Sequence, residues 1–126
     1  MKHLLLITIL TISFFCTNAQ VNNNSGIVFD TTVYNFGVIE KGSNAECVFS
    51  FVNKSETLVV ITNVKASCGC TVPTWTKEPI KPGGAGKINV KYNTNKIGDF
   101  SKIINVYTDK NEQSIVLTIK GEVKKN

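Results

Sequence analysis

The fold is decided by one stretch, Ala45-Glu46-Cys47-Val48-Phe49-Ser50-Phe51-Val52, in which apolar residues occupy every second position from Ala45 to Phe51. Side chains two residues apart in a strand point to the same face of a sheet, so this pattern predicts a β-strand with one buried face. Because Cys47 shares that face with Phe49 and Phe51, we expect its thiol to be a small core group.

Similar short segments fill most of the chain, and turn residues separate them. Segments 86–92 and 115–123 alternate in the same way, and strands are also expected at 27–29, 34–39 and 100–107. Leu58–Val64 is rich in β-branched residues, which predicts a central strand buried on both faces. About seven strands and no helical period predict an all-β, immunoglobulin-like sandwich. We expect six side chains to share its core: Phe49, Phe51, Ile88, Val90, Leu117 and Ile119.

The N-terminus has the pattern of a secretory signal peptide. Lys2 and His3 precede an apolar run from Leu4 to Phe15, and small or polar residues lead to Ala19. The run is shorter than the roughly 20 residues that a membrane span needs, so we expect cleavage after Ala19. Residues 1–19 are then the signal peptide, 20–26 a flexible leader, and 27–124 one sandwich domain.

Cys16 offers an alternative, a lipid-modified anchor. Bacterial lipoprotein signals need small residues before the cysteine, but Phe14 and Phe15 stand there, so we favour cleavage over lipidation. The predicted product is an exported protein without a membrane span.

The basic residues argue against a nucleic-acid partner. Lysine and arginine together number 14, against nine acids, and every one of the 14 is lysine. Arginine is the side chain best suited to bidentate contacts with phosphates and bases, so a lysine-only surface favours a solvated face that keeps sheet edges soluble.

Common catalytic groups are missing. The only histidine, His3, lies in the predicted signal peptide, which excludes Ser-His-acid triads, Cys-His pairs and histidine zinc sites from the mature chain. We therefore expect a non-enzymatic protein without a cofactor, thiol–disulfide exchange being the one reaction left open.

The motif Cys68-Gly69-Cys70 carries the remaining chemistry. In an extended segment both sulfurs point to one side, and we expect Gly69 to let the backbone tighten between them. We expect the pair to lie at a sheet end, with the sulfurs close enough to bond.

Three roles for the pair stay open. A disulfide across so short a segment should be strained and easily reduced, as in a redox pair, and two thiolates could instead bind a soft ion such as Cu(I). The third role is a local loop clamp or a pair of partly buried thiols, which would have no chemistry.

Seven motifs follow one another along the chain: Tyr34-Asn35-Phe36-Gly37-Val38-Ile39-Glu40-Lys41-Gly42, Phe49-Ser50-Phe51-Val52-Asn53, Leu58-Val59-Val60-Ile61, Ser67-Cys68-Gly69-Cys70-Thr71, Pro82-Gly83, Gly98-Asp99-Phe100 and Ile119-Lys120-Gly121-Glu122-Val123. In this order they resemble the domain of unknown function 1573 family, found largely in secreted proteins of the Bacteroidetes. The resemblance covers nearly the whole predicted mature chain; Cys47 matches no position of the family pattern.

The resemblance implies an immunoglobulin-like fold akin to the major-sperm-protein and ciliary-type modules, most of which are interaction modules without catalysis. It also implies the periplasm or cell surface of a Gram-negative bacterium. The leading hypothesis is a non-catalytic, extracytoplasmic binding or structural module whose partner is an envelope protein or a glycan. The rival is a thiol–disulfide or Cu(I)-handling protein that uses Cys68 and Cys70.

Overall fold

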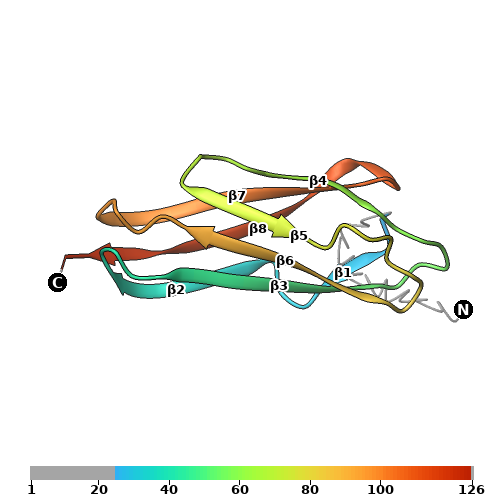
Figure 1. The fold of residues 1–126 in the computed structure, drawn as a ribbon, viewed down its shortest axis with the longest axis horizontal. Helices are drawn as coiled ribbons and strands as arrows, with labels where there is room; N and C mark the ends of the chain where they lie inside the picture. The colour runs from blue at the N-terminus through green and yellow to red at the C-terminus, as the bar shows by residue number, and fades with distance from the viewer. Residues whose placement is uncertain (1–24, 126) are drawn as a thin grey trace, which may run out of the picture.

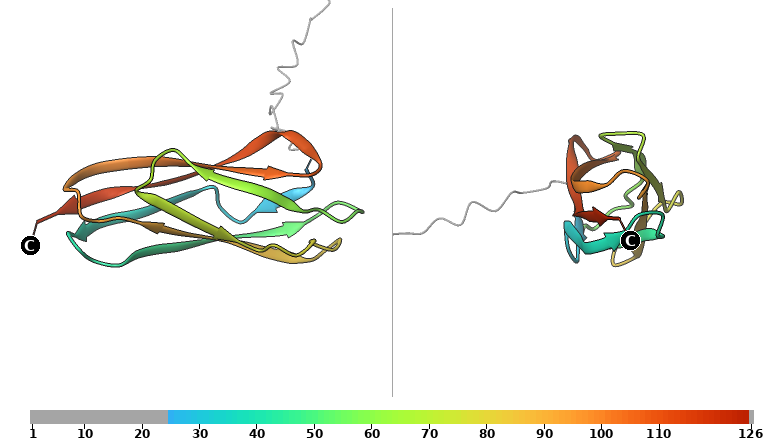
Figure 2. Two further views of the ribbon diagram at one scale, coloured as in Figure 1. Left: turned by 45° about the horizontal axis from the view of Figure 1, so that its top comes forward. Right: turned by 90° about the vertical axis from the view of Figure 1, so that its left-hand side faces the viewer.

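The structure, a computed structural model, describes residues 25–125. Within them the chain forms eight strands in two four-stranded sheets (Figures 1 and 2). The strands are β1 Ile27–Phe29, β2 Val33–Glu40, β3 Ala45–Asn53, β4 Ile61–Ala66, β5 Thr71–Trp75, β6 Ala85–Tyr92, β7 Gly98–Thr108 and β8 Asn111–Lys124. One sheet has the order β1-β3-β6-β5 and the other β2-β8-β7-β4, which confirms the predicted all-β sandwich.

The core lies between the inner faces of the two sheets. Phe49 of β3 is opposite Ile88 of the antiparallel β6, and Leu117 of β8 is opposite Ile104 of β7. All four side chains are fully buried. The six core residues expected from the alternation are all buried in a single cluster, so the predicted register is confirmed.

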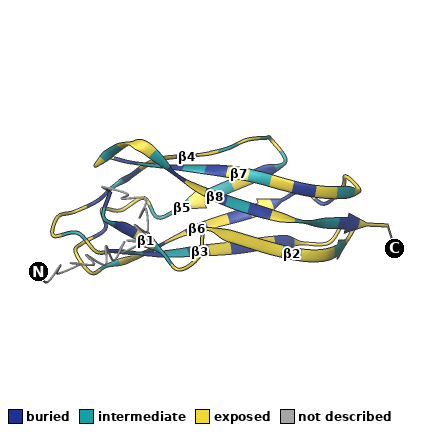
Figure 3. Ribbon diagram, turned by 180° about the vertical axis from the view of Figure 1, so that it is seen from behind, coloured by how far each residue is buried: buried dark blue, intermediate teal, exposed yellow. Residues whose placement is uncertain are grey.

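The two sheets differ in the direction of their strand pairs. β7 and β8 form a long antiparallel hairpin joined by the two residues Asp109 and Lys110, whereas β2 runs parallel to β8. β1 and β2 follow each other in the chain but belong to different sheets, and each lies at the edge of its sheet. β2 is mostly exposed along its length (Figure 3).

Two strand predictions are corrected. The segment after the cysteine pair, where no strand was predicted, contains the eighth strand, β5. The β-branched run at 58–64 is not a central strand: only its second half belongs to a strand, β4, which is the edge of its sheet. Leu58 is exposed, and Val59 is held by a single bridge to Ile80. β-branched residues suit an edge strand as well as a central one, so composition alone could not decide its place.

Several predictions concern residues 1–24, which lie outside the described part of the chain. They are the signal peptide, its cleavage after Ala19, the question of Cys16, and most of the leader. Of the leader, Ser25 is buried, and the Gly26 carbonyl accepts a hydrogen bond from the Lys54 amide at 2.7 Å. Residues 25–125 contain no helix of the length and hydrophobicity that crossing a bilayer requires.

Candidate functional site

Three turns meet at one end of the sandwich, here called the disulfide end: Lys41–Asn44, Ser67–Cys70 and Asn93–Ile97. Their backbones are joined by hydrogen bonds, since the Gly42 amide donates to the Thr94 carbonyl at 3.3 Å and the Asn93 amide to the Cys70 carbonyl at 2.8 Å. The last strand ends here too, because the Lys41 amide donates to the Lys124 carbonyl at 2.8 Å (Figure 1).

Cys68 and Cys70 are joined by a disulfide in the turn between β4 and β5, with their Cα atoms 5.3 Å apart. Both residues are half-buried. The expectation of bonded sulfurs at a sheet end is confirmed. The Thr71 amide donates to the Cys68 carbonyl at 3.3 Å and closes the turn.

Gly69 is not required by the backbone, contrary to the sequence-based expectation. Its φ is not positive, and a Cβ added to it would meet no atom within 4 Å. An alanine would therefore fit.

The hydroxyl group of Thr71 lies beside both sulfurs. Its Oγ1 is 3.8 Å from the Sγ of Cys68 and 3.8 Å from the Sγ of Cys70. Thr71 is only 3% exposed, so this hydroxyl is held in place next to the disulfide.

Lys102 is a residue of the site that the sequence reading missed. It lies opposite the fully buried Ile119, on the inward-facing side of β7 that also carries Phe100 and Ile104, and is half-buried. A lysine at an apolar position of an alternating strand breaks the local rule, and such breaks concentrate at functional sites. That signal was available in the sequence.

The turn that carries the disulfide is fixed to β7 beside Lys102. The Ser67 amide donates to the Ile103 carbonyl at 2.9 Å, and the Ile103 amide donates to the Ser67 hydroxyl at 3.2 Å. These bonds bring together residues that are more than 30 positions apart in the chain.

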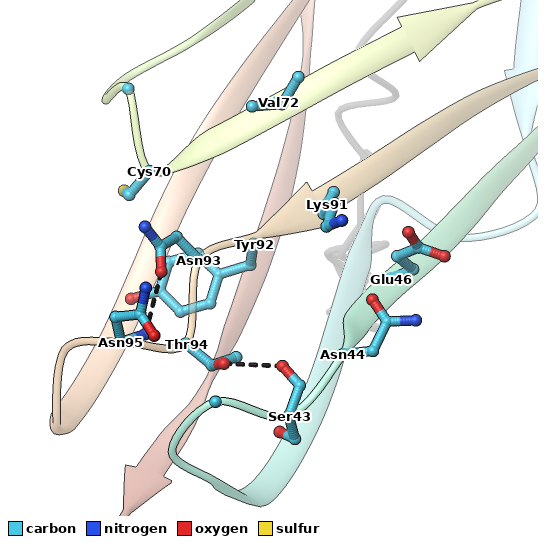
Figure 4. A pocket seen from close by; sticks show the side chains of 12 residues that line it. Ser43, Asn44, Glu46, Cys70, Val72, Lys91, Tyr92, Asn93, Thr94 and Asn95 are labelled. Carbon is cyan, nitrogen blue, oxygen red and sulfur yellow. Dashed lines mark hydrogen bonds between the residues drawn. The ribbon is translucent and has the colours of Figure 1, made fainter.

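Two clefts adjoin the disulfide. The amide–hydroxyl cleft, of about 630 Å³, has Cys70 on one side and Ser43 and Asn44 on the other (Figure 4), and Gly69 also lines it. The lysine cleft, of about 480 Å³, is lined by Cys68, Cys70, Tyr92, Asn93, Asn95, Lys96 and Lys102. Cys70 therefore borders both clefts, whereas Cys68 borders only the lysine cleft.

Tyr92 forms part of the wall of both clefts from the core side. Its ring is buried and stacks on Phe100, with the ring centroids 3.9 Å apart. Burial raises the pKa of its phenol. With one face covered and the residue buried, the ring is no open platform for a sugar or a base.

Cys47 is the free cysteine of the described residues, and it lies in the core. Burial raises the pKa of its thiol to about 11, so the thiol stays protonated and unreactive at neutral pH. The prediction of a core role for Cys47 is confirmed.

The described residues contain no cluster of metal-binding side chains that would support the soft-metal hypothesis. Within residues 25–125 no three His, Cys, Asp or Glu side chains are grouped so that they could hold a metal ion. Metal ligation also needs thiolates, and Cys68 and Cys70 are in a disulfide here.

The model of the protein family of unknown function DUF1573 matches residues 27–123. The chain belongs to this family. A comparison with curated proteins finds no match. The family match includes β1 to β7 in full and all but the last residue of β8, so the disulfide end lies within the DUF1573 domain.

Solved structures with the same fold come from unrelated settings. The PapD-like domain 7 of human CEP192 has a TM-score of 0.69 at 10% identity, covering 82% of this chain and 88% of that one. WR4, a major-sperm-protein family member of Caenorhabditis elegans, has 0.52 at 12%, covering 79% and 99%. The VesB protease of Vibrio cholerae has 0.62 at 14%, and the match covers 79% of this chain but 32% of the protease. These likenesses show a PapD-like and major-sperm-protein-like sandwich and no more than the fold; the likeness to the major-sperm-protein fold was expected.

Proposed function

We propose that this DUF1573 protein is a non-catalytic, extracytoplasmic binding module that holds a partner of the cell envelope at its disulfide end. The observation that carries the proposal is the amide–hydroxyl cleft beside Cys70. It is a concave surface at one end of a rigid sandwich, formed by turns from three different parts of the chain. Binding residues are often carried on loops that a rigid scaffold positions.

A polypeptide partner is favoured over a glycan. The cleft offers amide and hydroxyl groups from Ser43, Asn44 and Asn95, and the exposed Val72 stands at its border. Amide groups can pair with a peptide backbone, and an exposed apolar side chain is a suitable anchor. Tyr92 is turned into the core, so the stacking surface typical of sugar binding is not offered there.

The extracytoplasmic location is supported by two independent features. The predicted signal peptide directs export, and the Cys68–Cys70 disulfide persists most readily outside the reducing cytoplasm. A periplasmic or surface location in a Gram-negative envelope remains part of this proposal.

The absence of catalysis is supported by the composition of the predicted mature chain, which has no histidine. The similarity to VesB does not bear on this point, because the chain spans about a third of that protease.

The binding end can be tested with two matched valine variants. Val72→Asp places a charge at the border of the amide–hydroxyl cleft, and Val116→Asp places the same charge on the outer face of β8, in the opposite sheet; the parent residues are 57% and 48% exposed. Each variant is expressed in the native host and cross-linked to its partners in intact cells. The cross-linked partner is then identified by mass spectrometry.

We expect Val72→Asp to lower recovery of the main partner about tenfold, while Val116→Asp leaves it unchanged. Equal recovery with Val72→Asp, or loss with Val116→Asp alone, would place the binding surface elsewhere. A cross-linked partner that is digested by glycosidase but not by protease would show that the partner is a glycan and not a polypeptide. Recovery of the protein from the cytoplasm would contradict the proposed location.

A further inference from the structure

Beyond binding, we propose that the Cys68–Cys70 disulfide oxidises dithiols of exported polypeptides by thiol–disulfide exchange. The geometry points to Cys70 as the sulfur that is attacked and to Cys68 as the sulfur that leaves. Three features of the disulfide end carry this inference: a disulfide with little structural use, a position of Cys70 on both clefts, and two lysines that line the one cleft that Cys68 borders.

The disulfide adds little to the stability of the fold. It closes a loop of residues 68–70 only, and a cross-link over so short a loop removes little entropy from the unfolded chain. The turn is already held by the bonds from Asn93 to Cys70 and from Ser67 to Ile103. Reduction would therefore leave both thiols in place.

Cys70 borders a cleft that Cys68 does not reach. An attacking thiolate, the central sulfur and the leaving sulfur lie close to a line in disulfide exchange. The amide–hydroxyl cleft is lined by Cys70 and not by Cys68, so a partner held in this cleft lies next to Cys70. Gly69 lines the same cleft and adds no side chain to it.

The sulfur of Cys68 would leave toward positive charge. Lys96 and Lys102 line the cleft that Cys68 borders, and no carboxylate lines that cleft. Among residues 25–125 the only ion pair is that of Lys124 with Glu122, so both ammonium groups are free to stabilise a thiolate. Thr71 Oγ1, 3.8 Å from the Cys68 sulfur, is a further donor.

The reaction is balanced without another reactant. A thiolate of the partner attacks the Sγ of Cys70, the S–S bond breaks, and Cys68 leaves as a thiolate that takes up a proton. The second thiolate of the partner then attacks the partner's own sulfur in the mixed disulfide and releases Cys70 as a thiolate. The partner loses two electrons and two protons and gains a disulfide, while Cys68 and Cys70 become two thiols.

The same charges define the class of substrate. A cysteine flanked by aspartate or glutamate would be attracted to Lys96 and Lys102, whereas one flanked by lysine would be repelled. Complementary charge raises the rate of encounter and makes it dependent on salt. We therefore expect exported polypeptides with acidic residues next to their cysteines to be the preferred substrates.

The experiment uses the natively processed protein and synthetic peptides with two cysteines, flanked either by glutamate or by lysine. Peptide disulfide and protein thiols are measured by mass spectrometry after acid quenching and alkylation. We expect one peptide disulfide per protein, about tenfold faster for the glutamate peptide. The variant with Cys47→Ala should react as the wild type, and the variant with Cys68→Ser and Cys70→Ser should not react. Oxidation at the same rate by that double variant, or an intact Cys68–Cys70 bond after prolonged incubation with excess peptide, would overturn the proposal.

Two further measurements test the assigned roles. A peptide with a single cysteine cannot complete the second step, and we expect to find it bound to Cys70; finding it mainly on Cys68 would reverse the assignment. Lys102→Gln should slow exchange about tenfold and shift upward the pH profile for alkylation of Cys68 in the reduced protein, and Lys102→Arg should restore both. Unchanged rates and pH profile in Lys102→Gln, at wild-type thermal stability, would remove Lys102 as a positioning residue.

Discussion

Asn53 shows how much one buried polar side chain contributes. It is completely buried at the end of the sandwich opposite the disulfide. Its amide nitrogen donates to the carbonyls of Thr57 at 2.8 Å and Ile80 at 2.9 Å, and its oxygen accepts from the Ser55 amide at 2.9 Å. One side chain thus satisfies the backbone of two loops, β3–β4 and β5–β6. In the sequence, Asn53 is simply a turn residue after a strand.

Replacement of Asn53 by alanine is expected to destabilise the fold by about 2–3 kcal/mol, because buried backbone groups lose their partners. The free energy of unfolding is measured by urea denaturation. Asn89→Ala, at an exposed position of β6, is the matched control and should change stability by less than about 0.5 kcal/mol. Similar losses in the two variants would show that the hydrogen bonds of Asn53 are not the cause.

Among the elements, β5 is the edge strand nearest the site, and its sequence protects that edge. The Asn93 amide bonds to the Cys70 carbonyl and the Thr76 amide to the Lys87 carbonyl, so alternate residues of β5, Thr74 included, direct their backbone groups to β6. Pro73, between these positions, faces the free edge, where it has no N–H to offer another strand. Binding by strand addition at β5 is therefore disfavoured, which agrees with a partner site in the clefts.

Pro73→Val should expose a continuous edge and promote pairing between copies of the protein. We expect dimers or larger species that increase with protein concentration, measured by sedimentation velocity. Thr74→Val adds the same side chain on the neighbouring residue, whose backbone groups already bond to β6, and should remain like the wild type. A Pro73→Val protein that stays in the wild-type species at all concentrations would show that Pro73 is not what protects this edge.

At the scale of the whole molecule, the core contains two groups that must stay neutral. Burial raises the pKa of Cys47 from 9.0 to about 11, and it raises the pKa of Tyr92 above its ordinary value of 10.0. In both groups the charged form appears at high pH and is disfavoured by folding. Their contribution to stability is therefore complete below about pH 9 and is lost as pH rises through the folded pKa.

The free energy of unfolding should accordingly fall between pH 9 and about 11. Denaturation in urea at a series of pH values measures this fall. Cys47→Val keeps an apolar side chain of similar size and removes the ionisable thiol, so its stability should fall less steeply over the same range, while surface lysines affect both proteins alike. Parallel curves for the two proteins would show that the thiol is not a source of the pH dependence.

The features that the sequence determined by itself depend on the local alternation of apolar and polar residues. In β3, Phe49 and Phe51 repeat with the two-residue period of a strand, and burial of one face follows wherever that period holds. For this reason the core, the core role of Cys47 and the sandwich class could be predicted. The closeness of Cys68 and Cys70 could be predicted too, because residues two positions apart in the sequence cannot lie far apart in space.

Only the tertiary structure decided what depends on partners distant in the chain. β5 is short and contains Pro73, so it forms a strand only because it pairs with β6. β4 lies at an edge because it pairs with β7 alone. Lys102 and Cys68 line the same cleft because Ser67 continues the pairing of β4 with β7. The physical reason is that alternation states which way a side chain faces, whereas the neighbours it meets there are set by hydrogen bonding between strands far apart in sequence.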